Sequence, residues 1–428
     1  MLTQIKISNF KSFNDAIINL NDLNVLIGSN MSSKSNFINV FKFLNCIVNN
    51  GLDNAISTQG GIKYLKNLNN TWKVPLEISL KAKENFSFPL IKKNVMYHVE
   101  IFDLEYSIQL KFKENLEHYE IVNEKIVLKG IFYKSKIKPR KGFIKANEIK
   151  KHKIGKQYNI EFVMSNSKGE IDTKLVKENN LITKEDIIPK HIISLVEAMI
   201  KQDPEISILN SPLSDLPIRW SSIFRDITFY DIDPKICKQP TKINGEKQIK
   251  ENGENLAITI KEIMKKNRSK SQFLNLIKDL LPIIQDIGTE QFIDNNMIFK
   301  LNEKYSEESF IPAELTSDGT NNLIASIIAL YFTKTNLILI EEPERNIHPK
   351  LISKLVQMME EASHRKQIIV TTHNPELLKH VNIENILFIS RDENGFSTIS
   401  NPSENEHVKM FLNEEIGIED LFIDNLLM

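Results

Sequence analysis

The pattern of apolar and polar positions at the start of the chain predicts two strands followed by a buried one. Residues 2–10 largely alternate between apolar and polar side chains, and a second strand is expected over residues 13–20. Residues 23–27 form an apolar run, which is typical of a buried strand. A helical pattern over residues 37–48 comes next. The predicted order is therefore strand, tight loop and helix.

Strand-like and helix-like patterns also alternate along the rest of the chain. Three β-like runs between residues 74 and 112 predict an antiparallel meander, and residues 184–226 are mainly helical. The later elements are a strand, two helices, a hairpin, and then buried strands separated by helices. The expected ranges are 76–80, 97–104 and 106–112 in the meander, and 227–234, 256–266, 271–286, 287–301, 321–332, 337–340, 350–362, 367–371 and 386–389 after it.

Length and composition set broad limits on the class of protein. A chain of 428 residues is too long for one compact core, so two or three lobes are expected. Lys+Arg and Asp+Glu both total 55, so the overall charge favours neither nucleic acid nor a membrane surface. Neither Cys46 nor Cys237 belongs to a C-x-x-C pair, and the apolar stretch over residues 323–332 is too short to span a bilayer. We expect a cytoplasmic protein with no membrane partner.

The loop between the buried strand and the first helix has the spacing of a phosphate-binding P-loop. Residues 28–36, Gly-Ser-Asn-Met-Ser-Ser-Lys-Ser-Asn, fit G-x-x-x-x-G-K-[ST] except that Ser33 stands in place of the second glycine. Backbone N–H groups at the start of a helix hold anionic phosphates. In such a loop Lys34 would bridge the β- and γ-phosphates and Ser35 would bind Mg²⁺. On this loop alone, an ordinary polar turn before a helix is an equal alternative.

The last third of the chain contains side chains that would complete such a site. Residues 337–342 form a buried strand, expected to be parallel, that ends in two carboxylates: Glu341 could hold Mg²⁺ through water, and Glu342 could orient and deprotonate the attacking water. Adjacent acids need a turn to lie together, and Pro343 is expected to supply it. His373 follows another buried strand and could reach a γ-phosphate. The alternatives are solvated acids at a strand end and a structural histidine.

A second polar loop also opens a helix. Residues 315–320, Leu-Thr-Ser-Asp-Gly-Thr, precede the helix expected over residues 321–332. The first turn of a helix carries unpaired N–H groups and a partial positive charge. The loop is therefore another candidate for contact with a phosphate.

The order of these fragments resembles the ATPase head of the ABC class, and more closely the RecF/SMC-like and OLD-type family of standalone AAA ATPases. The resemblance is strong over residues 1–65 and 225–385 and poor between them. It implies an α/β fold, a P-loop ABC-type ATPase head with a mixed sheet and flanking helices, split by a central α+β insertion. The matching segments are 5–13, 23–28, 229–234, 252–257 and 340–344, and the expected parts are 1–115, an inserted basic lobe over 116–225, and 226–428.

The resemblance also assigns roles to individual residues. It makes residues 28–36 the Walker A loop, residues 315–320 the signature loop, Gln59 a Q-loop residue and His373 the switch histidine. In this family the signature loop of one subunit closes on the nucleotide held by another, which implies a homodimer or a higher even oligomer around ATP and Mg²⁺. The resemblance implies catalytic roles for Glu342 and His373, Mg²⁺ binding by Ser35, Glu341 and Gln59, and nucleotide binding by Gly28, Asn30, Ser33, Lys34, Ser35, Asn36, Gln59, Ser317, Asp318, Gly319 and Asn346.

Three positions depart from the family pattern. Met31 and Ser33 stand where the family usually has glycine, and Glu341 stands where an aspartate is more common. A Cβ at Ser33 crowds the nest in which the backbone approaches phosphate. Because Lys34 and Glu342 remain, we predict that ATP is bound and slowly hydrolysed, with weakened binding as the alternative.

The branch of the family suggests a role. OLD-type nucleases carry a Toprim domain of about a hundred residues after the head, whereas 55 residues follow His373 here. We therefore expect no nuclease within this chain. It resembles ATPase subunits of bacterial phage-defence systems, such as those of Septu, PARIS and retrons, which work with a separately encoded nuclease or toxin. The alternatives are a nucleotide-stabilised, non-catalytic scaffold and a DNA-binding, RecF-like repair ATPase.

One stretch of the chain is strongly basic. Residues 125–156 contain twelve Lys and Arg residues and a single acid, Glu148. Such a stretch can hold an anionic partner, either DNA or an acidic effector surface. The alternative is a solvated hairpin.

Overall fold

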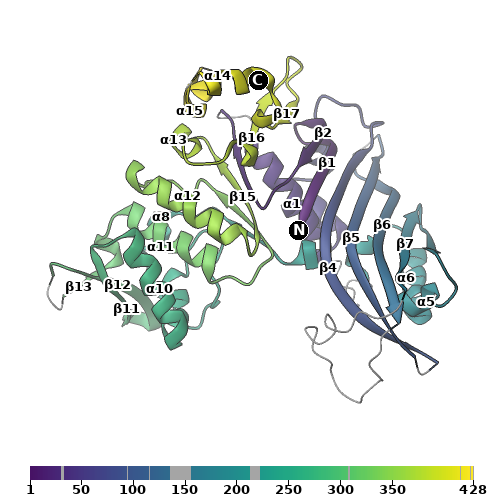
Figure 1. Ribbon diagram of the computed structural model, residues 1–428, viewed down its shortest axis with the longest axis horizontal. Helices are drawn as coiled ribbons and strands as arrows, with labels where there is room; N and C mark the ends of the chain where they lie inside the picture. The colour runs from purple at the N-terminus through teal and green to yellow at the C-terminus, as the bar shows by residue number, and fades with distance from the viewer. Residues whose placement is uncertain are drawn as a thin grey trace. The chain divides into compact units, whose positions relative to one another are not determined.

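A computed structural model describes residues 1–29, 33–93, 95–114, 116–134, 156–212, 222–306, 309–414, 416–424 and 426–427. The chain forms two compact units (Figure 1). The first unit consists of Met1–Leu20, Ser35–Asp226 and Arg391–Thr398, and the second of Asn21–Lys34, Ile227–Ser390 and Ile399–Met428. Neither unit is a continuous segment of the sequence, so each depends on the whole chain for its assembly.

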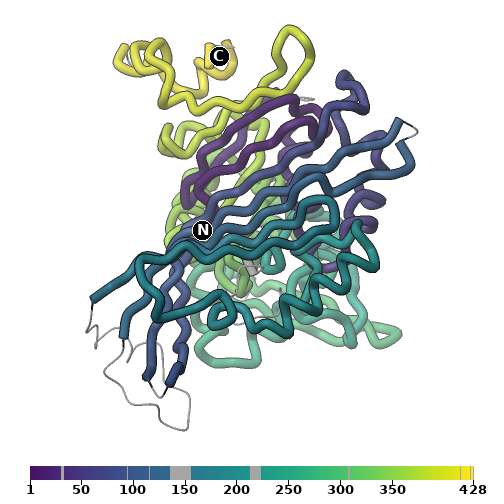
Figure 2. The backbone as a smooth tube through the Cα atoms, turned by 90° about the vertical axis from the view of Figure 1, so that its right-hand side faces the viewer, coloured from purple at the N-terminus to yellow at the C-terminus, as the bar shows by residue number. Residues whose placement is uncertain are grey.

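The first unit is built on a seven-stranded antiparallel sheet with the order β2-β1-β4-β5-β6-β7-β8, whose strands run side by side in Figure 2. Alternation of buried and exposed residues along these strands gives the sheet a covered face. Register follows this alternation, since Ile7 lies opposite Ala16 on one side and Ile78 on the other. The strands are β1 Leu2–Phe10, β2 Phe13–Asn19, β4 Leu76–Lys92, β5 Val95–Phe112, β6 Tyr119–Lys134, β7 Tyr158–Ser167 and β8 Glu170–Lys177.

The predicted break between residues 104 and 106 is wrong, because β5 continues without interruption from Val95 to Phe112. Glu105, at the predicted break, is a charged residue within this strand. In the structure its carboxylate accepts a hydrogen bond from Lys129 of β6 at 2.7 Å, so a cross-strand ion pair accommodates the charge within the strand.

Helices complete the first unit. The helix that follows the phosphate-binding loop, α1, packs on the sheet through its broad apolar face, with the Phe43 ring centroid 5.8 Å from that of Phe10 on β1. Its first residue, Lys34, belongs to the second unit. The helices are α1 Lys34–Asn50, α2 Leu52–Thr58, α3 Ile62–Leu65, α5 Lys184–Ile187, α6 Lys190–Gln202, η2 Ile208–Asn210 and α7 Ser222–Arg225.

The second unit contains a six-stranded sheet with the order β17-β16-β3-β15-β14-β9. The five strands from β16 to β9 are parallel, as expected for continuous apolar runs. Register aligns their carboxyl ends: Ile27 of β3 lies opposite Thr372 of β15, and Thr371 lies opposite Glu341 of β14. The strands are β3 Leu23–Ile27, β9 Ile227–Tyr230, β14 Leu337–Glu341, β15 Gln367–Thr372, β16 Ile386–Arg391 and β17 Ser397–Ser400.

The core of the second unit lies between this sheet, its helices and a smaller sheet. Alternate residues of β3, namely Leu23, Val25 and Ile27, enter the core, and every residue of α11 from 321 to 330 is buried. A helix that is apolar on all sides belongs in a protein interior. The remaining elements are α8 Pro234–Cys237, β10 Thr241–Lys242, α9 Leu256–Met264, α10 Asn267–Leu280, β11 Ile284–Phe292, η4 Ile293–Asn295, β12 Asn296–Glu303, β13 Phe310–Pro312, η5 Ala313–Leu315, α11 Asp318–Tyr331, α12 Pro349–Ser363, α13 Pro375–Leu378, η6 Ile383–Asn385, η7 Pro402–Glu404, α14 Glu406–Asn413 and α15 Ile418–Ile423.

The predicted α/β class is confirmed, with a large antiparallel sheet, a mainly parallel sheet and a smaller antiparallel sheet, together with helices. The predicted division at residues 115 and 225 stays a prediction. After residue 115, β6 pairs with β5, β7 pairs with β6 and β8 pairs with β7, so all three strands belong to the same sheet as β5. No helix in the described part of the chain is long and apolar enough to cross a membrane.

Candidate nucleotide-binding site

Three of the predicted site segments leave the carboxyl ends of parallel strands in the second unit. The predicted phosphate-binding loop follows β3, Glu342 follows β14, and His373 follows β15. Because these strands are parallel and adjacent, their loops meet at one edge of the sheet, where ligands bind in open α/β sheets.

In the predicted phosphate-binding loop, the Lys34 side chain turns back towards the backbone at the start of the same loop. Its Nζ donates to the carbonyl oxygen of Gly28 at 2.7 Å and to that of Ser29 at 3.0 Å. Burial lowers the pKa of Lys34, and the charges of Glu342 and Glu344 act in the opposite direction. The negative charges of these two carboxylates thus favour the protonated form of Lys34.

Ser33 and its neighbours show how the loop departs from the glycine-rich pattern. Ser33 adopts a φ of +78°, the left-handed region that favours glycine. Ser35 is exposed at the second position of α1, and the Asn36 amide donates to Ser12 Oγ at 2.9 Å. Asn30, which was predicted to contact nucleotide, and Met31 lie outside the described residues.

Glu342 occupies a turn at the end of β14. Its φ is +45° and its N–H donates to the Thr371 carbonyl at 2.8 Å, so the left-handed residue itself makes the turn that we expected from Pro343. Glu342 Oε1 lies 2.7 Å from His373 Nδ1. The sequence predicted both residues for one site, and the structure brings their side chains into contact.

Arg345 holds the other oxygen of this carboxylate. Glu342 Oε2 accepts from Arg345 Nε at 3.3 Å and from Nη2 at 3.2 Å. Burial would raise the pKa of Glu342, but the hydrogen bonds and charges of His373 and Arg345 outweigh burial and lower it. Glu342 is consequently an ionised carboxylate with a donor on each oxygen.

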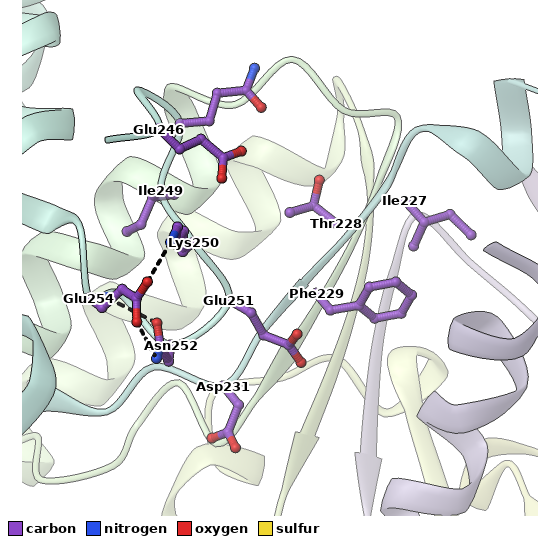
Figure 3. A pocket seen from close by; sticks show the side chains of 11 residues that line it. Ile227, Thr228, Phe229, Asp231, Glu246, Ile249, Lys250, Glu251, Asn252 and Glu254 are labelled. Atoms are coloured by element: carbon purple, nitrogen blue, oxygen red, sulfur yellow. Dashed lines mark hydrogen bonds and ion pairs between the residues drawn. The ribbon is translucent and has the colours of Figure 1, made fainter. Parts of the chain in front are cut away.

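Sequence reasoning missed the role of Arg345 and of its second partner, Asp231. Asp231 follows β9 and lies 3.1 Å from Arg345 Nη2. It also lines an open cavity of about 610 Å³ (Figure 3). In that view Lys250 is joined to Glu254, at 2.5 Å, and Asp231 lies apart from them. An acid directly after a buried strand was the available signal for Asp231.

Glu344 was also missed, and it is the most buried carboxylate of these loops, at 5% exposure. One of its oxygens accepts a hydrogen bond from the Thr372 hydroxyl. The other oxygen has no hydrogen-bond partner among the described residues. Burial raises the pKa of Glu344.

The signature loop is anchored by its own side chains. Ser317 caps α11 by accepting from the Thr320 N–H at 3.1 Å, and Asp318 pairs with Lys238 at 2.6 Å. Both are typical of a helix N-terminus, where hydroxyl and carboxylate oxygens satisfy unpaired N–H groups and complement the dipole.

The turn after β14, which includes Asn346 at a φ of +61°, packs against this loop within the same unit. A Cβ placed on Gly319 would lie 2.3 Å from the Asn346 carbonyl oxygen, so only glycine fits there. The Asn322 side chain donates to the carbonyls of Pro343, at 3.0 Å, and Arg345, at 2.7 Å. The structure thus brings the predicted signature loop into contact with the turn that contains Asn346.

The remaining predicted residues are placed as follows. Glu341 is the last residue of β14 and is half-buried. Gln59 follows α2 in the first unit, where its N–H donates to the Ile56 carbonyl at 3.1 Å. Its predicted contact with Mg²⁺ or nucleotide stays a prediction, as do the ligand contacts of the other residues.

These loops lie on a parallel sheet after a strand–loop–helix unit, which is the arrangement of a P-loop ATPase domain. A family model described as "AAA domain, putative AbiEii toxin, Type IV TA system" matches residues 23–379, so the chain belongs to that family. No curated protein sequence matches the chain.

Three solved structures are similar in their backbone course. An SMC head bound to the C-winged helix domain of ScpA is 14% identical, with 93% of this chain and 97% of that chain covered and a TM-score of 0.43. The SMC head domain from Thermotoga maritima is 12% identical, with coverage of 94% and 98% and a TM-score of 0.37. An Smc head with an extended coiled coil, bound to the C-terminal domain of ScpA derived from Pyrococcus furiosus, is 13% identical, with coverage of 97% and 99% and a TM-score of 0.41.

Proposed function

We propose that this protein binds ATP and Mg²⁺ between two copies of the chain, hydrolyses ATP slowly, and controls a separately encoded effector, a nuclease or toxin, in bacterial phage defence. The observation that carries the ATPase part is the 2.7 Å contact between Glu342 and His373, at the strand edge where Lys34 also lies. A general base, a polar switch residue and a phosphate-binding cation are the parts that ATP hydrolysis needs.

Each residue has a separate task in this proposal. The Lys34 ammonium, which now rests on the Gly28 and Ser29 carbonyls, would turn to the β- and γ-phosphates. Glu342 would accept the proton of the attacking water, and His373 would orient that carboxylate. Ser35 and Glu341 would hold Mg²⁺, which neutralises phosphate charge when bound.

Absence of a built metal cage agrees with this use of Mg²⁺. Among the described residues, no group of three or more His, Cys, Asp or Glu side chains is arranged to hold a metal ion. Magnesium that arrives with a nucleotide typically takes one or two protein ligands and completes its shell with phosphate oxygens and water.

The test is ATP turnover and ATP affinity of the full-length chain. We expect Glu342→Gln to keep ATP binding and to abolish hydrolysis, because it preserves shape and removes the proton acceptor. We expect Lys34→Ala to abolish ATP binding. The matched control is Lys409→Ala, at an exposed lysine, which should bind ATP like wild type. Equal nucleotide affinity of wild type and Lys34→Ala in calorimetry would rule this site out.

A second candidate, a nucleotide-stabilised scaffold without turnover, is favoured by the backbone of Ser33. A side chain at a φ of +78° is strained and occupies the position where a P-loop needs a bare backbone. This scaffold would bind ATP and assemble, but purified wild type would release no phosphate above the level of Glu342→Gln.

The basic stretch over residues 125–156 supports a partner that is anionic, either DNA or an acidic effector surface. Of its twelve cations, Lys129 is paired with Glu105 and Lys156 lies 5.6 Å from the Tyr158 ring centroid. Eight others lie outside the described residues: Lys136, Lys138, Arg140, Lys141, Lys145, Lys150, Lys151 and Lys153. If the partner is DNA, log affinity should fall with log salt by roughly 0.9 per phosphate neutralised.

A further inference from the structure

Arg345 fills much of the hydrogen-bonding capacity of the proposed base. An ionised carboxylate offers about four acceptor directions, two on each oxygen. Arg345 donates twice to Glu342 Oε2, through Nε and Nη2, and His373 lies against Oε1. Among the described residues, these contacts leave one acceptor direction of Glu342 for a water molecule, and it is on the oxygen next to His373.

The guanidinium is itself held from two further sides. Its Nη2 lies 3.1 Å from Asp231 Oδ1, and its Nη1 donates to the Ile232 carbonyl at 3.2 Å. Both partners follow β9, whereas Glu342 follows β14. Asp231 and Glu342 therefore share one cation across two neighbouring strand ends.

We propose that Arg345 is a positioning residue that restrains the Glu342 carboxylate, and that Asp231 moderates this restraint by sharing the guanidinium. The inference rests on the proposed function, since it takes Glu342 as the base. An attacking water needs a free acceptor on that base. Arg345 occupies Oε2 and fixes the direction of the carboxylate, so a water molecule can reach the base only through Oε1. Turnover is therefore slow while the guanidinium stays in place.

The two partners of the cation should respond in opposite directions. Arg345→Met keeps the length of the side chain and frees Oε2, and we expect kcat to rise by about tenfold, the effect of one charged hydrogen bond on a barrier. KM for ATP should change little, because the restraint acts on the base and not on the phosphates. Asp231→Asn leaves Glu342 as the one carboxylate on Arg345, and kcat should fall.

Control variants separate positioning from general stability. Arg345→Lys keeps the charge but lacks the two-nitrogen fork, so its kcat should lie between those of wild type and Arg345→Met. The double variant Arg345→Met, Asp231→Asn should match Arg345→Met alone, because Asp231 acts through Arg345. Lys250→Met, at the separate Lys250–Glu254 pair near the same cavity, should leave kcat unchanged.

A binding readout supplements turnover. In the background of Glu342→Gln, Arg345→Met should leave the calorimetric affinity for ATP unchanged. Thermal unfolding reports whether each variant is folded. If Arg345→Met does not fold, the kcat of Arg345→Lys relative to wild type tests the proposed restraint instead.

The failure of this inference differs from the failure of the proposed function. If Glu342→Gln abolishes turnover but the folded Arg345 variants hydrolyse ATP no faster than wild type, the restraint is refuted and the ATPase stands. If wild type and Glu342→Gln release phosphate at the same rate, the proposed base is wrong and the inference falls with it.

Discussion

Ser33 combines a strained backbone with a functional position. A left-handed φ costs a residue with a Cβ about 1–2 kcal/mol, a strain that glycine would relieve. Glycine also gives the unfolded chain more conformational entropy, which destabilises the folded state by about 0.4–1 kcal/mol. Ser33→Gly should therefore raise the free energy of unfolding by up to about 1.6 kcal/mol. It should also tighten ATP binding, because it restores the bare backbone of a P-loop.

Denaturant unfolding and calorimetry measure these two effects of Ser33→Gly. Ser29→Gly is the matched control in the same loop, since Ser29 is not among the residues with positive φ. Equal gains in the two variants would show that the conformation of Ser33 is not the cause.

Lys366 gives a pH dependence at the residue scale. Burial lowers its pKa from 10.5 to about 8, although its ammonium donates to the Thr333 carbonyl at 2.8 Å. Between pH 8 and 10.5 the unfolded chain binds more protons at this group than the folded chain, so its contribution makes stability rise with pH. Below pH 8 the destabilising effect of the buried charge is fully present.

A comparison of Lys366→Met with wild type isolates the contribution of this one group. We expect the variant to gain stability relative to wild type at pH 7, and the difference to shrink as the pH rises towards 10. Lys201→Met, at an exposed lysine, is the control. A difference in unfolding free energy that stays constant from pH 7 to 10 would contradict the pKa shift.

At the scale of elements, sequence reasoning succeeded where one local signal decides. The bounds of β1 and β3 were predicted to the residue, because regular alternation and an apolar run each end at a turn. The bounds predicted for the helix over residues 271–286 are wrong, because α10 spans Asn267–Leu280 and β11 already begins at Ile284. Pro282 disfavours helical geometry at the residue before it, a signal in the sequence that our prediction did not use.

The candidate site shows the same division. The closeness of Glu342 and His373 could be expected from the sequence, since each directly follows a strand pattern, and Lys34 stands at the P-loop spacing after β3. Their functional roles stay predictions. Arg345 and Asp231 could not be paired from the sequence, because their contact depends on β9 and β14 being neighbours in the sheet. Sheet order is a property of the whole fold and leaves no local pattern.

The contact between the start of α11 and the turn after β14 predicts a sensitive glycine. Gly319→Ala would place a Cβ 2.3 Å from the Asn346 carbonyl oxygen, so the turn must shift. We expect a loss of about 1–3 kcal/mol in the free energy of unfolding, as for other overpacked sites. Gly288→Ala on β11 is the control, because its Cβ would meet neighbours at 3.4 Å or more. Equal stability losses in denaturant titrations would argue against a special role for this contact.

At the scale of the whole molecule, the division into two units sets how assembly must be tested. The chain passes between the units several times, and Lys34 and Ser35 belong to different units. A fragment that ends at any of these crossings before the last one removes part of both units. Experiments on nucleotide and on partners therefore need the full chain.

Assembly around ATP is the last prediction. The exposed Ser317 and the Gly319 contact place the signature loop at the start of α11, and the proposed role of that loop is to close on the nucleotide of a second copy. A ligand held between two copies stabilises the assembly by mass action. Glu342→Gln with ATP and Mg²⁺ should therefore form a dimer or a larger even assembly in light scattering, because ATP stays bound when it is not hydrolysed.

Adding Lys34→Ala should return the protein to a monomer, and Ser317→Arg should do so while keeping ATP affinity. A Glu342→Gln protein that binds ATP in calorimetry and stays monomeric would show that the nucleotide is not shared between copies.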